Sequence, residues 1–165
     1  MKKKRDISRR EFIKKAGFTV AAVGMSSAVP KLLKPAQAAV RDHILIGRPL
    51  PMTGPVSVFT TVSPWIDNKA IADINKEGGI YIKEAGKKLP VRVKIVDTES
   101  DPTKAGDVGS KLILNDNIDI MYVSATPATV SPVAAGCERF KVPCVSTMMP
   151  VEMFLLGGPF HWAFD

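Results

Sequence analysis

The sequence predicts an α/β fold, a three-layer α/β/α sandwich around a mainly parallel sheet. Short apolar runs rich in β-branched residues alternate with segments whose apolar residues recur at helical spacing. Three such strand–helix units follow one another between residues 44 and 140. Consecutive units of this kind make parallel strands, and right-handed crossovers place their helices on both faces of the sheet.

The first unit begins with the apolar run Ile44–Gly47, which is short and β-branched and therefore predicts a buried strand. A loop over residues 52–61 follows it. Ser63-Pro64 is typical of a helix N-cap with proline in the first turn, and Gly78-Gly79 ends the helix. The predicted apolar face of this helix consists of Ile66, Ala70, Ile71 and Ile74.

The second unit follows a charged segment, residues 81–88, which is expected to be a surface excursion. Apolar and basic residues alternate from Val91 to Ile95, a pattern that predicts a strand with a partly basic face at a sheet edge. Asp101-Pro102 repeats the cap-and-proline pattern, and the second helix should end near Asn115. Its apolar stripe consists of Ala105, Val108, Leu112 and Ile113.

The third unit has a strand over residues 118–124 and a helix from about Thr129 to Phe140 with Pro132 early in it. A fourth strand is expected over residues 143–146. The chain then becomes rich in Met, Gly and Phe, and a final strand is expected over residues 160–164.

The first 38 residues have the pattern of a twin-arginine signal peptide. Residues 8–14 read Ser-Arg-Arg-Glu-Phe-Ile-Lys, after a basic start and before a mild apolar stretch over residues 16–30. Ala36-Gln37-Ala38 then offers the small-x-small pattern that signal peptidase needs. We therefore expect export through the Tat translocon, cleavage after Ala38 and location in the periplasm, with residues 39–165 forming the folded domain.

Charge is distributed unequally between these two parts. The whole chain has a formal charge of +7, with 23 Lys and Arg and 16 Asp and Glu. The leader holds 10 of these basic residues and 2 of the acidic ones, which leaves 13 basic and 14 acidic residues in the other 127. Because the basic excess is confined to the leader, nucleic acid and membrane surfaces are excluded as partners.

The two cysteines, Cys137 and Cys144, are seven residues apart. An oxidising compartment permits a disulfide between them, and two buried free thiols are the other interpretation. No CxxC motif or nearby His pair accompanies them, so neither a redox site nor a metal site is predicted.

Hydroxyl-bearing residues gather in the loops that follow the predicted strands. Ligands of doubly wound sheets bind beyond the carboxyl ends of the strands. Hydroxyls and free N–H groups beside helix N-termini can hold a carboxylate there, although Ser and Thr also cap helices and turn chains for structural reasons. The four loops are Met52-Thr53-Gly54-Pro55, Thr98-Glu99-Ser100, Ser124-Ala125-Thr126 and Ser146-Thr147-Met148.

Signals for catalysis are absent from the sequence. His43 and His161 have no nucleophile elbow or acidic partner at a recognisable spacing, and no phosphate-binding glycine motif is present. Glu99 and Asp101 could form an acidic pair, but Asp101 is better explained as a helix cap. We therefore predict a protein that is not an enzyme, with no catalytic residues, no metal and no cofactor.

The order of motifs resembles the periplasmic branched-chain amino acid and amide binding proteins of ABC transporters. The resemblance extends over nearly all of residues 44–165. Its matching segments are residues 46–55 with Leu-Pro-Met-Thr-Gly-Pro, residues 72–80 with Asn-Lys-Glu-Gly-Gly, residues 97–105 with Ser-Asp-Pro-Thr-Lys-Ala, residues 126–134 and residues 142–146.

The resemblance implies a receptor built of two α/β lobes that close on a small molecule and pass it to a membrane permease. Residues 39–165 match the N-terminal lobe only, so a fragment lacking the C-terminal lobe is expected. The ligand implied is an amino acid, an amide or a related carboxylate. The ligand-binding residues implied are Phe59, Ser124, Ala125, Thr126, Ser146 and Thr147.

One departure from the resemblance concerns the loop after Ser146. This loop reads Met148-Met149-Pro150 where the related proteins usually have a Ser- or Ala-rich turn. Two methionines favour a more apolar or adaptable pocket, although packing in the core is their more usual role. Two other functional interpretations remain open. One is a sensing module of the same fold coupled to signalling, and the other is an exported enzyme.

Overall fold

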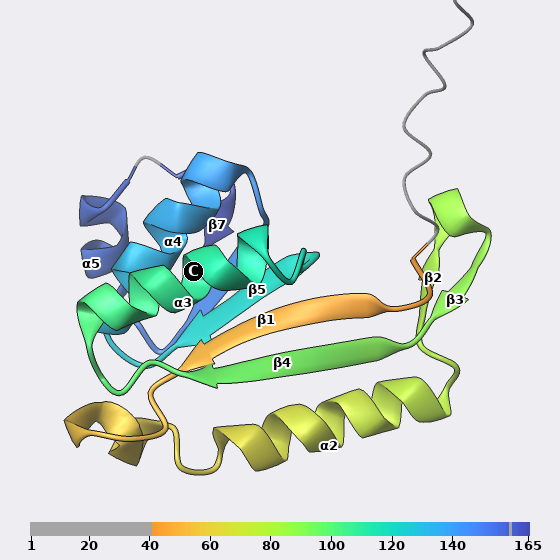
Figure 1. The fold of residues 1–165 in the computed structure, drawn as a ribbon, viewed down its shortest axis with the longest axis horizontal. Helices are drawn as coiled ribbons and strands as arrows, with labels where there is room; N and C mark the ends of the chain where they lie inside the picture. Colours follow the sequence, from red (N-terminus) through yellow and green to blue (C-terminus); the bar gives the residue numbers. More distant parts are fainter. Residues whose placement is uncertain (1–40, 159) are drawn as a thin grey trace, which may run out of the picture. The chain divides into compact units, whose positions relative to one another are not determined.

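The computed structural model describes residues 41–158 and 160–165, and the predicted signal peptide, residues 1–38, lies outside these ranges. The elements are β1 (Ile44–Leu50), α2 (Ser63–Lys76), β2 (Ile80–Ile82), β3 (Lys87–Leu89), β4 (Val91–Asp97), α3 (Pro102–Leu114), β5 (Ile120–Ser124), α4 (Pro127–Phe140), β6 (Cys144–Thr147), α5 (Val151–Leu156) and β7 (Ala163–Phe164). The strands of the main sheet are connected by helices along the described chain, and a short β2–β3 hairpin lies between α2 and β4 (Figure 1).

Five strands form one parallel sheet in the order β4-β1-β5-β6-β7. The predicted α/β fold with a parallel sheet is therefore confirmed, and β4 is an edge strand as its basic face predicted. Because all five strands run the same way, their carboxyl ends meet at one edge. We call this edge, with its loops at residues 51–55, 98–100, 125–126 and 148–150, the carboxyl edge.

Helices cover the two faces of the sheet unequally. Helices α3, α4 and α5 lie on one face, and α2 lies on the other beside β1 and β4 (Figure 1). The larger core fills the α3–α4 face, and its fully buried side chains include Leu112, Met121, Val123, Val130 and Val133. A smaller cluster of Ile44, Leu89 and Val91, with Ile46 and Ile71 packed against it, lies on the α2 face.

The junction between α2 and β4 is fixed by Asn75 and Gly79. The Asn75 side chain donates to the Val91 carbonyl and accepts from the Val91 N–H, both at 2.8 Å, so it mimics a neighbouring strand. Gly79 has φ +90°, and a Cβ there would lie 2.0 Å from the Leu89 carbonyl oxygen. The predicted end of the helix at Gly78-Gly79 is confirmed, and close packing against β3 is the reason that Gly79 tolerates no side chain.

The structure corrects several element boundaries. Val62, not Ser63, is the N-cap of α2, and Ser63 is its first residue. Helix α4 begins at Pro127 rather than at Thr129 because Thr126 is its N-cap. Residues 81–88 are exposed as expected, except for the half-buried Ile82, but they contribute to a β2–β3 hairpin that the charge pattern did not predict. Helix α5 was not predicted, and the final strand covers only Ala163–Phe164.

The two cysteines are buried free thiols in the structure, and no disulfide joins them. Cys137 of α4 and Cys144 of β6 belong to the larger core. A hydrogen bond with Cys144, together with burial, raises the pKa of the Cys137 thiol. A thiol with a raised pKa is a poor nucleophile, and these two side chains therefore act as small apolar groups of the core.

Candidate functional site at the carboxyl edge

Asp97 ties together the first two loops of the carboxyl edge. It is the last residue of β4, opposite Leu50 of β1. Its Oδ1 accepts the N–H groups of Met52 (2.9 Å) and Glu99 (2.8 Å), and its Oδ2 accepts the Thr53 hydroxyl at 2.7 Å. One carboxylate thus fixes both loops.

The ionised form of Asp97 is the one that these contacts favour. Burial by itself would raise the pKa of the carboxyl group. The hydrogen bonds from the Thr53 hydroxyl and from backbone N–H groups outweigh that effect and lower the pKa of Asp97. A second tie comes from Ser100, whose hydroxyl donates to the Thr53 carbonyl at 2.6 Å and accepts the Val56 N–H at 3.1 Å.

Two buried hydroxyls at this edge have no hydrogen-bond partner among the described residues. They belong to Thr98 and Ser124, each 1% exposed, and each lies at or directly after the end of a strand. A buried hydroxyl without a partner costs about 1–3 kcal/mol, so such groups are rare in folded proteins. Unmet hydrogen-bonding capacity is therefore concentrated where the fold class binds ligands.

Backbone strain marks the same loops. Six described residues other than glycine have positive φ angles, and four of them lie at the carboxyl edge, namely Glu99, Ser100, Ala125 and Met148. Ala125 has the largest value, 121°, directly after Ser124. Conformations of this kind cost about 1–3 kcal/mol each and cluster at ligand-binding sites. Ala125 connects the end of β5 to the N-terminus of α4 within two residues.

The structure brings some of the predicted site residues together. Ser124 and Thr147 are paired residues at the ends of neighbouring strands β5 and β6. Thr126 caps α4, and its N–H donates to the Thr129 hydroxyl at 3.4 Å. These positions place hydroxyls and the N-terminus of α4 at one end of the sheet, where the helix dipole favours an anion. Pro127 has no N–H group, and the Thr129 and Val130 N–H groups donate to the Thr126 carbonyl.

The side chains of Ser146 and Phe59, two further predicted site residues, have different surroundings from those of Ser124 and Thr147. The Ser146 hydroxyl donates to the Phe164 carbonyl at 3.3 Å and bonds the Asp165 carboxylate, so the side chain is engaged with β7. Phe59 ends a 3-10 helix, Pro55–Phe59, in the loop after β1 and is 53% exposed. Its ring is therefore accessible in the loop that follows β1.

The other candidate chemical groups have structural partners. Asp101 caps α3 by accepting the Lys104 N–H at 2.6 Å, as predicted, and Glu99 forms an ion pair with Lys104. His161 lies 3.0 Å from Glu138, and His43 contacts Asp42. Within residues 41–158 and 160–165, no group of three or more His, Cys, Asp or Glu side chains could hold a metal ion.

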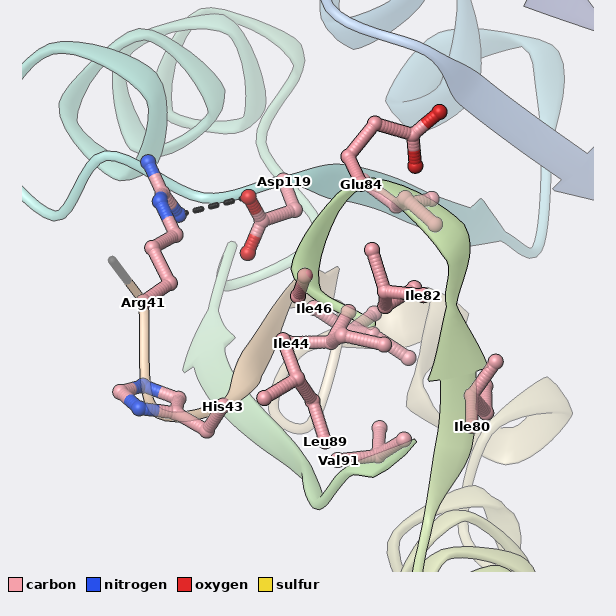
Figure 2. Close-up of a pocket in the computed structure, with 12 residues that line it drawn as sticks. Arg41, His43, Ile44, Ile46, Ile80, Ile82, Glu84, Leu89, Val91 and Asp119 are labelled. Atoms are coloured by element: carbon pink, nitrogen blue, oxygen red, sulfur yellow. Dashed lines mark ion pairs between the residues drawn. The ribbon is translucent and has the colours of Figure 1, made fainter. Parts of the chain in front are cut away.

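A pocket of about 500 Å³ lies at the opposite end of the sheet, beneath the β2–β3 hairpin. Figure 2 shows isoleucine, leucine and valine side chains converging in it, with the Arg41–Asp119 ion pair at its rim. The two charges of that pair lie 2.7 Å apart and neutralise each other. None of the predicted site residues lines this pocket, and its interior offers no convergent polar groups to orient a ligand.

No helix in the described part of the chain combines the length and apolar character that crossing a bilayer requires. No family model and no curated protein matches the sequence.

Solved structures share this fold. The branched-chain amino acid transporter substrate-binding protein LivJ from Streptococcus pneumoniae, solved with isoleucine, is 22% identical with a TM-score of 0.64 over 74% of this chain and 33% of its own. A leucine-binding protein, LivK, from Thermotoga maritima is 21% identical, with a TM-score of 0.57 over 73% and 31%. A solute-binding protein from Rhodopseudomonas palustris, solved with 3,4-dihydroxybenzoic acid, is 22% identical, with a TM-score of 0.57 over 74% and 31%.

These three proteins are substrate- or solute-binding proteins, and the chain spans about a third of the length of each. Likeness at this level of identity shows a shared architecture. The fold of this chain is that of one lobe of a periplasmic solute-binding protein.

Proposed function

We propose that the chain is the N-terminal lobe of an extracytoplasmic receptor that captures a small molecule and delivers it to the permease of an ABC transporter. The second lobe, in this proposal, is supplied by further polypeptide that completes the cleft. The ligand is a small carboxylate, such as an amino acid, or a related amide. Binding without turnover is the activity proposed.

The observation that carries this proposal is the Ser124 hydroxyl, buried at the end of β5 without a partner among the described residues and followed by the strained Ala125. A ligand oxygen at this place would satisfy the hydroxyl and also meet the N-terminus of α4. The two ligands present in the solved neighbours, isoleucine and 3,4-dihydroxybenzoic acid, both carry a carboxylate. Hinge closure of two lobes then buries the ligand.

The proposal is tested on the complete exported protein by thermal unfolding with isoleucine, 3,4-dihydroxybenzoate, other amino acids, amides and urea. A ligand that binds only the folded state raises the unfolding temperature by mass action. Ser124→Ala and Thr126→Ala should each reduce that increase, whereas Ser110→Ala, a change in α3, should not. An unchanged unfolding temperature with every compound would contradict the proposal.

The export route forms the second part of the proposal. We infer that the Ser-Arg-Arg-Glu-Phe-Ile-Lys segment directs the protein through the Tat translocon and that cleavage follows Ala38. Replacing Arg9 and Arg10 by lysine keeps the positive charge of the leader and should block export. The measurement is the amount of protein in the periplasmic fraction, and unaffected secretion would refute this route.

A further inference from the structure

Arg48 is a buried cation in the middle of β1. Its side chain is 2% exposed, its Nε lies 2.9 Å from Asp67 Oδ2 of α2, and its Nη1 donates to the Tyr122 carbonyl at 3.4 Å. An arginine in this position must be fully partnered, because an unpaired buried charge is very costly. The guanidinium is therefore fixed between α2 and β5.

The Tyr122 ring lies against this guanidinium. Arg48 Cζ is 3.9 Å from the ring centroid, which is the geometry of a cation–π contact. Tyr122 is paired with Val145 across the sheet, yet its hydroxyl lies 3.4 Å from the Thr147 hydroxyl. Thr147 is two residues nearer to the carboxyl edge than Val145, so the ring leans along the strands toward that edge.

Three hydroxyl-bearing side chains therefore lie on one side of the sheet near the ends of β5 and β6. Tyr122 and Ser124 are alternate residues of β5 and face the same side of the sheet, and Thr147 is the paired partner of Ser124. The Tyr122–Thr147 separation of 3.4 Å is long for a hydrogen bond between hydroxyls, which are usually 2.5–3.0 Å apart. Both hydroxyls therefore keep the capacity for a stronger partner, as the unpartnered Ser124 hydroxyl does.

We propose that Tyr122 is a further ligand-binding residue, whose hydroxyl donates to a carboxylate oxygen of the bound molecule beside Ser124 and Thr147. Arg48 holds the ring in the orientation that this contact requires. The inference rests on the proposed receptor function and adds to it a specific preference for a carboxylate, because the phenol donates a proton that an anionic oxygen accepts more strongly than a neutral amide does.

The test compares Tyr122→Phe with the wild type in the complete exported protein. The substitution removes the hydroxyl and leaves the ring on Arg48. The probes are isoleucine and 3,4-dihydroxybenzoate, each measured beside its primary amide by isothermal titration calorimetry. Tyr122→Phe should weaken binding of the carboxylate about tenfold and that of the amide less, so the preference for the carboxylate falls.

Tyr81→Phe is the matched control, because Tyr81 is an exposed tyrosine of the β2–β3 hairpin and its change should leave both affinities unaltered. Thermal unfolding without a probe checks that Tyr122→Phe folds like the wild type.

The outcomes separate the two proposals. If neither probe binds the wild type, the receptor function fails and this inference fails with it. If a probe binds and Ser124→Ala weakens it while Tyr122→Phe does not, the function stands and the role of Tyr122 is refuted. An equal loss for carboxylate and amide would also refute it, because that pattern indicates a general effect on the site.

Discussion

The two ends of the sheet differ in their chemistry. The pocket at the amino ends of the strands is lined mostly by apolar side chains. Its charged lining residues include Arg41 and Asp119, which form an ion pair with each other, and Glu84. The carboxyl edge has hydroxyls without partners in the described part of the chain, strained residues and a helix N-terminus. From this comparison we infer that unmet hydrogen-bonding capacity, rather than cavity volume, indicates where this fold holds a polar ligand.

The two ends also differ in how they are stabilised. At the amino end, close backbone packing of Gly79 against β3 and the Asn75–Val91 hydrogen bonds fix the hairpin and helix. At the carboxyl edge, the charged group of Asp97 and the hydroxyl of Ser100 fix the loops. Stability at the amino end should therefore depend on shape, and stability at the carboxyl edge should depend on pH.

The largest effect is expected for Gly79→Ala. A Cβ would lie 2.0 Å from the Leu89 carbonyl oxygen, and φ is +90°. We expect the free energy of unfolding to fall by about 3 kcal/mol or more. Gly86→Ala is the matched control, because Gly86 also has a positive φ, +63°, but no atom lies within 4 Å of the added Cβ.

The control should cost only about 1 kcal/mol. Urea denaturation followed by circular dichroism measures both changes. Equal losses in the two variants would show that close packing does not hold the amino end.

A smaller, pH-dependent effect is expected for Asp97→Asn. The amide cannot accept all the hydrogen bonds that the carboxylate accepts, so we expect a loss of about 1–2 kcal/mol at pH 7. Because the folded-state pKa of Asp97 is lowered, its stabilisation is complete above the unfolded-state pKa and is lost as the pH falls through the folded-state pKa.

The difference between Asp97→Asn and the wild type should therefore disappear in acid. Denaturation at pH 7 and below about pH 3 tests this, since the ordinary aspartate pKa is about 3.9. Asp107→Asn, a change of an exposed carboxylate in α3, serves as the control and should show no such trend. A loss of unfolding free energy that is the same at both pH values would contradict the role of the ionised Asp97 carboxylate in fixing the two loops.

The smallest effect is expected for Ile80→Ser at the amino-end pocket. Ile80 is 44% exposed, so its replacement should change the free energy of unfolding by less than about 1 kcal/mol. Affinity for a bound carboxylate should not change. A loss of ligand binding in this variant, measured by calorimetry, would contradict a site at the carboxyl edge and would indicate that the ligand binds in the amino-end pocket.

The sequence predicted the parallel sheet because its strands are short, β-branched and separated by amphipathic helices with clear stop signals. Asp101-Pro102 and Gly78-Gly79 each fix a helix end through local chemistry, so both boundaries could be read without tertiary information. The β2–β3 hairpin was missed because its strands have three residues each and are mostly exposed. Such short strands carry little alternation.

The candidate site was predicted in part. Its loops could be predicted from the strand order. The contacts of Asp97 could not, because they depend on the parallel pairing of β1 with β4, which brings Asp97 next to Met52, 45 residues away in the sequence. The proposed role of Tyr122 depends on its contact with Arg48, and the strand pattern of the sequence does not predict that these two residues meet. The available signal was an arginine, Arg48, inside the mostly apolar segment Ile44–Leu50, since a buried cation requires partners.

The most direct test of the account is the location of the ligand by nuclear magnetic resonance. Amide chemical shifts of the complete exported protein are compared before and after addition of isoleucine or 3,4-dihydroxybenzoate. The account predicts the largest changes at residues 124–126 and 147–148, with little change at residues 80–91. Changes concentrated at residues 80–91, with none at Ser124 and Ala125, would contradict the assignment of the carboxyl edge as the binding site.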